Sequence, residues 1–240
     1  MQLSNNKILV TGGASGIGLG LTERFIQENN TVIVCGRRAD VLDDVKRRFP
    51  TVITHQCDLS VEQERAELYN WIATYHSDLN VLVNNAGIQN WMNVADQNFY
   101  NKAQAEVTVN ILAPLHLTEL FLQLPALNTI MNVTSGLAFI PLSKVAVYSA
   151  TKAFFRSFTL SLRHQLKDRG VAVIEIIPPA LNTDLGGKGI HDGAPPVSDF
   201  IASIFEQLKN GSQELTFATS ADRAKANNEA ILPYFSRLNP

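Results

Sequence analysis

The chain has few of the features that mark secreted, membrane or nucleic-acid-binding proteins. Only 2 of its 240 residues are cysteines, and its 20 basic and 22 acidic residues leave a formal net charge of −2. No segment approaches the roughly 18 to 20 apolar residues of a membrane span, and the N-terminal MQLSNNKILV lacks the apolar run of a signal peptide. We therefore expect a cytoplasmic protein that acts on a small molecule and has no nucleic-acid or membrane partner.

Cysteine and histidine spacing disfavours a metal site. Cys35 and Cys57 lie in apolar, strand-like stretches without a CxxC pair or a Cys/His ligand pattern, so we predict reduced core thiols. The five histidines show no metal-ligand spacing either. We expect no metal.

Hydrophobic patterning predicts a doubly wound α/β fold. With 45% hydrophobic residues the chain can bury a full core, and we expect one domain over residues 1–240. Near-continuous apolar runs, typical of strands buried on both faces, alternate with helix-length segments. The runs are 7–11, 31–35, 51–57, 80–84, 129–134, 171–177 and 214–218. Such alternation predicts a parallel sheet with helices on both faces.

A glycine-rich stretch, TGGASGIG at 11–18, follows the first strand and opens the first helix. Glycines here let the backbone approach a pyrophosphate, while the N–H groups and dipole of the helix start stabilise its charge. The predicted contacts are Gly12, Ser15, Gly16, Ile17 and Gly18. A tight strand-to-helix turn is the alternative; a P-loop is disfavoured because no Gly-Lys-Ser/Thr ends the motif.

The residues after the second strand bear on which dinucleotide binds. NAD-specific sites usually have an acid about twenty residues beyond the glycines, whereas this chain has Arg37 and Arg38. Guanidinium groups can bind a 2′-phosphate, so NADP(H) is favoured, with NAD(H) possible and a solvated turn as the alternative. Asp58, with Leu59, is predicted to contact the adenine, because Ser60 and Gln63 have capping-box spacing that frees Asp58 from capping.

Tyr148 and Lys152, in the stretch YSATK, begin an apolar helix and share one of its faces, with roughly 6 Å of rise between them. A tyrosine of ordinary pKa near 10 is a poor base at neutral pH, and a nearby ammonium stabilises its phenolate. The pair suits proton transfer to a developing alkoxide, although an ordinary helix-surface pair has the same spacing.

These motifs together resemble the short-chain dehydrogenase/reductase family. TGGASGIG, NNAG at 84–87, Asn110, Ser135 and YSATK occur in the family's order, and the resemblance covers nearly the whole chain. The stretches NNAGIQ, VTSGLAF and LRHQLK are also similar to its bacterial DltE-type branch. The resemblance implies the strand order 3-2-1-4-5-6-7, with the cofactor across the switch point between the first and fourth strands.

The resemblance also implies residue roles. Tyr148 would be the general acid/base, Lys152 would lower its pKa and bind the nicotinamide ribose, Ser135 would bond the substrate oxygen, and Asn110 would hold a proton-relay water. Asn85, Ala86 and Gly87 would contact the adenosine half of the cofactor, although a polar strand-ending turn also explains them.

The segment PPALNTD carries a departure from the family. Pro179 replaces the usual glycine, which fixes φ and removes an N–H. Leu181 and Thr183 are placed near the carboxamide by the resemblance, with capping of a short helix as the alternative for Thr183. Trp91 and Met92 would either line the substrate cleft or anchor a loop.

The leading functional hypothesis is an NADP(H)-dependent reductase or dehydrogenase of a small carbonyl or alcohol. A nucleotide-binding regulatory or scaffold protein is the alternative, and an epimerase or dehydratase of the extended branch is disfavoured by the glycine spacing. The loop at about 182–200 and the segment at about 221–240 should shape the pocket, and the absence of an ionic signature there favours a neutral substrate. The family implies a homodimer or homotetramer through helices around 100–122 and 152–169.

Overall fold

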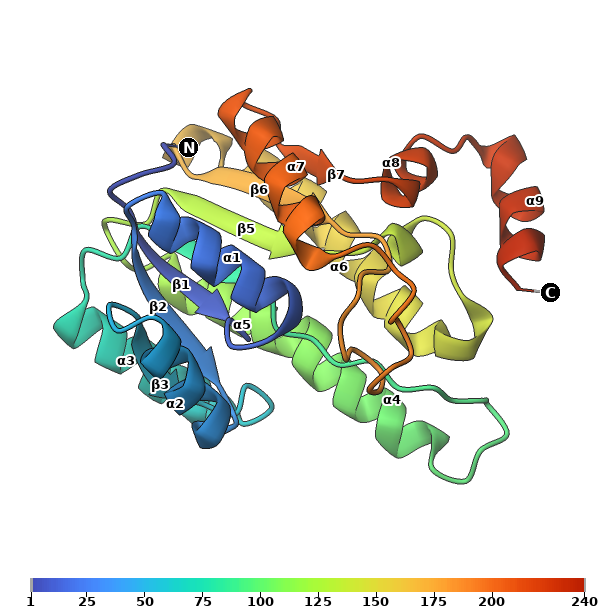
Figure 1. The fold of residues 1–240 in the computed structure, drawn as a ribbon, viewed down its shortest axis with the longest axis horizontal. Coiled ribbons are helices and arrows are strands. Elements are labelled where there is room, and N and C mark those ends of the chain that lie inside the picture. The colour runs from blue at the N-terminus through green and yellow to red at the C-terminus, as the bar shows by residue number, and fades with distance from the viewer. Residues whose placement is uncertain (1, 240) are drawn as a thin grey trace.

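A computed structural model describes residues 2–239 of the chain. Within that range, seven strands form one parallel sheet in the order β3-β2-β1-β4-β5-β6-β7 (Figure 1). The strands are β1 (Lys7–Thr11), β2 (Thr31–Gly36), β3 (Ile53–Gln56), β4 (Val81–Asn84), β5 (Thr129–Val133), β6 (Ala172–Ile177) and β7 (Glu214–Thr216). The predicted fold and strand order are confirmed, and each predicted strand is present with ends that shift by up to two residues.

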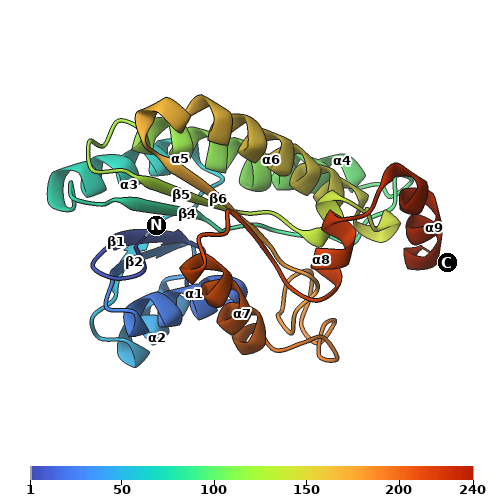
Figure 2. The same cartoon turned by 90° about the horizontal axis from the view of Figure 1, so that it is seen from above.

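Helices cover both faces of the sheet (Figure 2). The helices are α1 (Gly16–Gln27), α2 (Ala39–Arg48), α3 (Glu62–Tyr75), α4 (Phe99–Val107), α5 (Ala113–Phe121), α6 (Ala146–Gln165), α7 (Val197–Lys209), α8 (Thr219–Ala224) and α9 (Asn228–Leu238). Short segments are the π-helix η1 (Thr108–Leu112) and the 3-10 turns η2 (Gly136–Ala138), η3 (Ser143–Val145) and η4 (Lys167–Arg169). Within residues 2–239, none of these helices is long and apolar enough to cross a membrane.

The period-two alternation of strand side chains builds a separate core on each face. In β1, Ile8 and Val10 pack into the core beneath α1, α2 and α7, whereas Leu9 packs into the core with α3, α5 and α6. All three side chains are fully buried, and burying one such side chain stabilises the fold by about 1.5 to 3 kcal/mol. Two-sided burial explains why the strands read as apolar runs without alternation.

The strand order reverses between β1 and β4. β1 pairs with β2 on one side and β4 on the other, so the segments that follow β1 and β4 diverge at the carboxyl edge of the sheet. In folds of this kind that crevice binds the ligand. The loop 182–196 extends from β6 over the same edge and ends where α7 begins, at Val197 (Figure 1).

Candidate active site at the carboxyl edge of the sheet

The glycine-rich loop between β1 and α1 has a geometry that only glycine accommodates at two positions. Gly12 adopts φ +62°, in the left-handed region. A Cβ on Gly18 would lie 2.2 Å from the Gly12 carbonyl oxygen, so α1 begins directly against the loop. The N-cap residue, Ser15, makes no side-chain capping bond, and the first turn of α1 has no acidic residue. These features fit the phosphates of a dinucleotide.

Thr11 joins the glycine-rich loop to NNAG. Its hydroxyl donates to the Val83 carbonyl at 3.1 Å and accepts from the backbone N–H groups of Asn85 and Ala86 at 2.9 and 3.0 Å. Asn85 Nδ2 in turn donates to the Thr11 carbonyl at 2.9 Å. The predicted residues Asn85 and Ala86 therefore lie beside the loop at the switch point. The sequence reasoning placed Thr11 at the start of TGGASGIG but gave it no role of its own.

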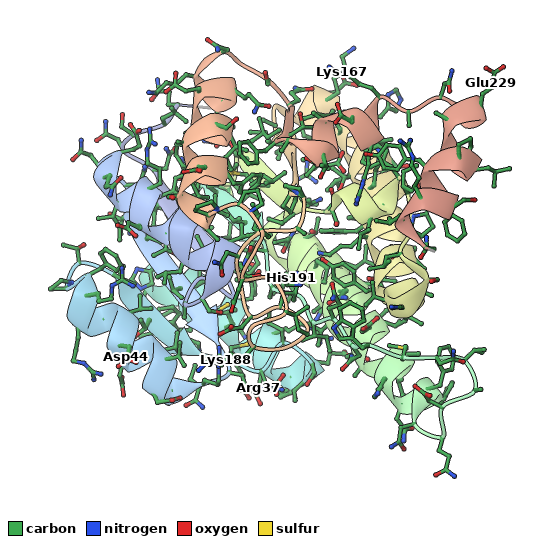
Figure 3. The ribbon with its side chains drawn as sticks, turned by 45° about the vertical axis from the view of Figure 1, so that its right-hand side comes forward. Arg37, Asp44, Lys167, Lys188, His191 and Glu229 are labelled. Carbon is green, nitrogen blue, oxygen red and sulfur yellow. The ribbon has the colours of Figure 1, made fainter. Side chains whose placement is uncertain are left out.

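The end of β2 carries the positive charge of Arg37 and Arg38, and one acid, Asp58, lies near Arg37. The Arg37 side chain is 73% exposed, and its NH1 lies 3.9 Å from Asp58 Oδ2. Although partial burial opposes the effect, hydrogen bonds from Ser60 and the charge of Arg37 hold the pKa of Asp58 below its ordinary value. Arg38 is the exposed residue that precedes α2. Figure 3 shows Arg37 on the same side of the molecule as the loop 182–196, which is marked by Lys188 and His191.

The predicted capping box at Ser60 is wrong. α3 begins at Glu62 after Val61, without a side-chain cap. Asp58 Oδ1 instead accepts from both the N–H and the hydroxyl of Ser60, at 2.9 and 2.7 Å, which makes a local Asx turn. The Asp58 side chain is therefore already hydrogen-bonded within the turn, contrary to the expectation that it is free. Leu59, beside it, is 8% exposed. The Asx turn forms in place of the capping box because the short side chain of Asp58 reaches the backbone N–H of Ser60, two residues on, more readily than Ser60 reaches Gln63.

Tyr148, Lys152 and Ser135 come together where β5 ends and α6 begins. Tyr148 and Lys152, on the first two turns of α6, are 6% and 4% exposed, and Ser135, just after β5, is 7% exposed. Lys152 Nζ lies 5.6 Å from the centre of the Tyr148 ring and donates to the Val133 carbonyl at 2.9 Å. The shared helix face predicted from the spacing is confirmed, and it is buried rather than on the surface.

Burial controls the proton affinities of this pair. Burial raises the pKa of Tyr148 above its ordinary value, opposed by hydrogen bonding with Ser135, while the Glu106 carboxyl adds to the rise. Burial also lowers the pKa of Lys152 to about 8. The expected lowering of the tyrosine pKa is therefore not found in the protein alone, because removal of the phenolate from water outweighs the hydrogen bonding with Ser135. Tyr148 is a proton donor in this state.

The lowered lysine pKa predicts a pH-dependent stability difference. Between pH 8 and the ordinary lysine value of 10.5, the unfolded chain binds a proton that the folded protein does not, so folding becomes more favourable as pH rises. Lys152→Met removes the buried ammonium and should stabilise the protein at pH 7 by about 1 to 2 kcal/mol, after loss of the bond to the Val133 carbonyl. Urea denaturation at pH 7 and pH 10 would measure this gain, which should shrink at pH 10.

The exposed Lys167 provides the control, because Lys167→Met should change the free energy of unfolding little at either pH. A Lys152→Met gain that is the same at both pH values, or larger at pH 10, would contradict the assigned proton affinity.

Asn110 anchors the segment after NNAG. Its Oδ1 accepts from the Ile88 N–H at 2.8 Å, and its Nδ2 donates to the Ile88 carbonyl at 2.9 Å and to Thr151 Oγ1 at 3.2 Å. Asn110 lies in the π-helix η1, where the widened turn breaks the regular hydrogen-bond ladder. A cavity of about 10 Å³, lined in part by Asn110 and Lys152, has room for about one water molecule.

Glu106 is a second buried anchor that the sequence reasoning missed. It lies one turn before Asn110 and is fully buried. Its Oε1 accepts from the Asn90 N–H at 2.5 Å and from Asn90 Nδ2 at 3.1 Å, while burial raises its pKa. Its spacing of four residues from Asn110 was the available signal. Gly87, the last residue of NNAG, lies against Asn110, because a Cβ there would be 3.3 Å from Asn110 Oδ1.

The segment after β6 returns to the glycine-rich loop. A Cβ on Gly16 would lie 3.3 Å from Thr183 Cγ2, and Leu181 is 3% exposed. No helix begins near Asp184; turns follow instead, and Thr183 Oγ1 accepts from the Leu185 N–H at 3.5 Å, so the capping alternative is wrong. Pro179 is in a trans peptide, and the preceding Pro178 carbonyl accepts from the Gly136 N–H at 2.9 Å.

Trp91 and Met92 have different environments. Met92 is 7% exposed, and its N–H donates to the Lys144 carbonyl at 3.2 Å, so it anchors the loop. Trp91 is 36% exposed, and its indole nitrogen lies 3.2 Å from a Cβ position on Gly186, against the loop 182–196. Both cysteines are buried free thiols, as predicted. The described part of the chain holds no cluster of three His, Cys, Asp or Glu residues suited to a metal ion.

A nucleotide-binding loop at the switch point, beside a buried tyrosine and lysine, is the arrangement of an NAD(P)-dependent oxidoreductase. The family model described as short chain dehydrogenase matches residues 6–192. The chain therefore belongs to the short-chain dehydrogenase family, whose members act on CH–OH and C=O groups. The resemblance inferred from the motifs is confirmed.

Relatives extend the likeness beyond the matched range. The chain is 40% identical to the uncharacterized oxidoreductase DltE of Bacillus subtilis (strain 168), over 99% of this chain and 96% of that protein. It is 31% identical to the NADP-dependent 3-hydroxy acid dehydrogenase YdfG of Escherichia coli O6:H1, over 71% of each chain. A short-chain dehydrogenase from Burkholderia cenocepacia J2315 in complex with NADP superposes with a TM-score of 0.86 at 25% identity, covering 98% of this chain and 99% of that one.

Proposed function

We propose that the protein is an NADP(H)-dependent reductase or dehydrogenase in which Tyr148 is the general acid/base for a small carbonyl or alcohol substrate. The observation that carries this proposal is the buried Tyr148, Ser135 and Lys152 cluster at the carboxyl edge, next to the glycine-rich loop. When bound, the nicotinamide supplies or accepts the hydride. In reduction, the phenol of Tyr148 gives its proton to the oxygen of the substrate as the carbon gains the hydride.

The neighbouring side chains support this proton transfer. Ser135, which acts to lower the pKa of Tyr148, orients the substrate oxygen. Lys152 binds the nicotinamide ribose and stabilises the phenolate left after proton transfer. Asn110 positions a water in the small cavity that it shares with Lys152, and this water returns a proton toward Tyr148. The pyrophosphate is held by Gly12, Ser15, Gly16, Ile17 and Gly18. The adenosine half is held by Asp58 with Leu59 and by Asn85 with Ala86 and Gly87. The nicotinamide is contacted by Leu181 and Thr183.

The preference for NADP(H) rests on the charge at the end of β2. Arg37 and Arg38 are exposed there, and no acid takes the position that binds a ribose 2′-hydroxyl in NAD-specific sites. A side-by-side titration of the purified protein with NADPH and NADH tests this. Tighter binding of NADPH supports the assignment, tighter binding of NADH overturns the cofactor preference, and binding of neither by a folded protein favours a scaffold role without turnover.

Arg37→Ala should separate the two cofactors. Loss of one guanidinium from the 2′-phosphate should weaken NADPH binding roughly 10- to 100-fold, while NADH binding changes little. Fluorescence titration of the reduced nicotinamide measures both dissociation constants. Arg47→Ala, on α2, is the matched control, because the Arg47 side chain is also 73% exposed and, like Arg37, lies near one aspartate, Asp44. Equal losses for NADPH and NADH would remove Arg37 from the phosphate site.

We also propose a homodimer or homotetramer through α4, η1 and α6. The exposed apolar side chains Leu112, Phe154 and Leu160 on η1 and α6 support this assembly, with exposed fractions of 49%, 45% and 42%. Sedimentation analysis of the parent and of Phe154→Glu tests the proposal.

The first substrates to screen are small 3-hydroxy acids and 3-oxo acids, beside neutral alcohols and ketones. The relative from Escherichia coli, which is named for NADP and 3-hydroxy acids, motivates the acidic set. The sequence patterning motivates the neutral set.

A further inference from the structure

Helix α8 packs directly behind the serine of the site. Ser220 Oγ donates to the Ile177 carbonyl at the end of β6, at 2.6 Å. A Cβ on Gly136, the residue after Ser135, would lie 3.3 Å from both Arg223 Cδ and Ser220 Cβ. α8 therefore lies over the carboxyl ends of β5 and β6, beside the entry to α6 (Figures 1 and 2). Ligands of doubly wound folds bind at this edge of the sheet.

Arg223 presents an uncompensated cation at that position. Its Nε is buried and has no hydrogen-bond acceptor among residues 2–239. No carboxylate in the described range lies within 4.0 Å of its guanidinium, and its nearest aromatic neighbour, Tyr234, is 5.9 Å from its Cζ. The arginines of α6 differ, since Arg156 and Arg163 pair with acids of β6 and β7. A buried guanidinium N–H without an acceptor is unfavourable and calls for an anion or water.

The rest of the C-terminal segment fixes α8 in place. Asn239, after α9, donates from Nδ2 to the Pro141 carbonyl at 3.1 Å and accepts from the Ser143 N–H at 2.5 Å. The segment between Ser135 and Tyr148 thus packs against α8 at Gly136 and is hydrogen-bonded to the residue after α9 at Pro141 and Ser143. Arg223 therefore lies beside the residue that follows Ser135.

We infer that Arg223 binds the carboxylate of an anionic substrate, a short oxo acid or hydroxy acid, whose reacting carbon lies at Tyr148 and Ser135. A guanidinium presents paired N–H donors that match a carboxylate. Successive Cα atoms lie about 3.8 Å apart, so Arg223 Cδ is within roughly 9 Å of the Ser135 Cα. That reach fits a carboxylate a few bonds from the reacting carbon. The inference rests on the proposed reductase activity, and it replaces the sequence-based preference for a neutral substrate.

The test compares acetoacetate with methyl acetoacetate, which keeps the ketone and removes the charge. Reduction of each compound with NADPH is assayed for the parent protein, for Arg223→Gln and Arg223→Lys, and for the control Arg237→Gln. Arg237 is matched because its Cζ lies 5.1 Å from the same Tyr234 ring. In the parent, kcat/KM should be higher for the acid than for the ester. In Arg223→Gln that ratio should fall roughly 30- to 100-fold, mostly through KM for the acid.

The remaining variants distinguish the contribution of the positive charge from that of the paired N–H donors. Arg223→Lys keeps the charge without the paired donors, so its ratio should fall between those of the parent and Arg223→Gln. Arg237→Gln should keep the parent ratio. A parent that does not prefer the acid, or an Arg223→Gln ratio equal to the parent's, overturns the inference, even if the ester is turned over and the proposed function stands.

A binding measurement distinguishes the inference from the reductase proposal. If neither compound is reduced by a protein that binds NADPH, the proposed activity fails. Thermal stabilisation by 3-hydroxybutyrate in the presence of NADP+ then tests Arg223 alone. Stabilisation of the parent that is lost in Arg223→Gln supports the anion site, and equal behaviour of the two proteins overturns it. The melting temperature of each variant without ligand shows that it is folded.

Discussion

Replacing Tyr148 with phenylalanine should reduce turnover by about 10²- to 10⁴-fold while leaving NADPH binding nearly unchanged. The substitution removes only the phenolic oxygen, and the buried ring keeps its contacts between α6 and the end of β5. Without that oxygen, the developing alkoxide loses the proton donor proposed for it. Steady-state reduction of a carbonyl substrate, together with fluorescence titration of NADPH, measures both quantities.

The control for Tyr148→Phe is Tyr100→Phe. Tyr100 lies on α4 and is 73% exposed, so the loss of its hydroxyl should affect neither turnover nor binding. Turnover retained within about threefold in Tyr148→Phe would exclude it as the acid/base. A parallel loss of NADPH binding would mean that the hydroxyl positions the cofactor instead.

Alanine at Gly18 should destabilise the protein by about 3 kcal/mol and abolish high-affinity cofactor binding. The added methyl would lie 2.2 Å from the Gly12 carbonyl oxygen and 2.5 Å from Asn85 Nδ2. Neither neighbour can yield easily, because the carbonyl is backbone and Asn85 is bonded to Thr11. The first turn of α1 must therefore move away from the loop that we propose holds the pyrophosphate. Urea denaturation and NADPH titration measure the two effects.

Gly20→Ala, half a turn further along α1, is the matched control. Its methyl would meet the side chains of Val197 and Ile201 on α7, with no backbone atom among the three nearest contacts. We expect a smaller loss of stability, about 1 kcal/mol, and unchanged NADPH affinity. Equal effects of the two substitutions would show that the close approach of α1 to the loop does not control the site.

The fold was predictable because the strands are buried on both faces. Ile8, Leu9 and Val10 each face a core, so the apolar run in the sequence directly reflects the structure. Element ends were less predictable. The apolar helix that begins at YSATK ends as α6 at Gln165, and the chain continues through the short turn η4 to Gly170, which adopts the left-handed conformation with φ +69°. Hydrogen-bond competition over a few residues decides such ends, and the hydrophobic pattern does not record it.

The candidate site was only partly readable from the sequence. Motif order gave Tyr148, Lys152, Ser135 and Asn110, which the structure brings to one edge of the sheet. The proton affinity of Tyr148 was not readable, because desolvation depends on the side chains that pack around it. The anchor Glu106 and the cation Arg223 were missed for the same reason, since each acquires its meaning from segments distant in the sequence.

The pairing of β1 with β4 also has a kinetic consequence. Thr11 and Val83 are 72 positions apart in the sequence, and this contact joins the two halves of the crevice. Closing so long a loop carries an entropic penalty before any compensating contacts form, which makes such pairings slow steps in folding. The crevice does not exist until that step is complete. A bound dinucleotide therefore stabilises the folded protein and slows its unfolding, and it does not accelerate folding.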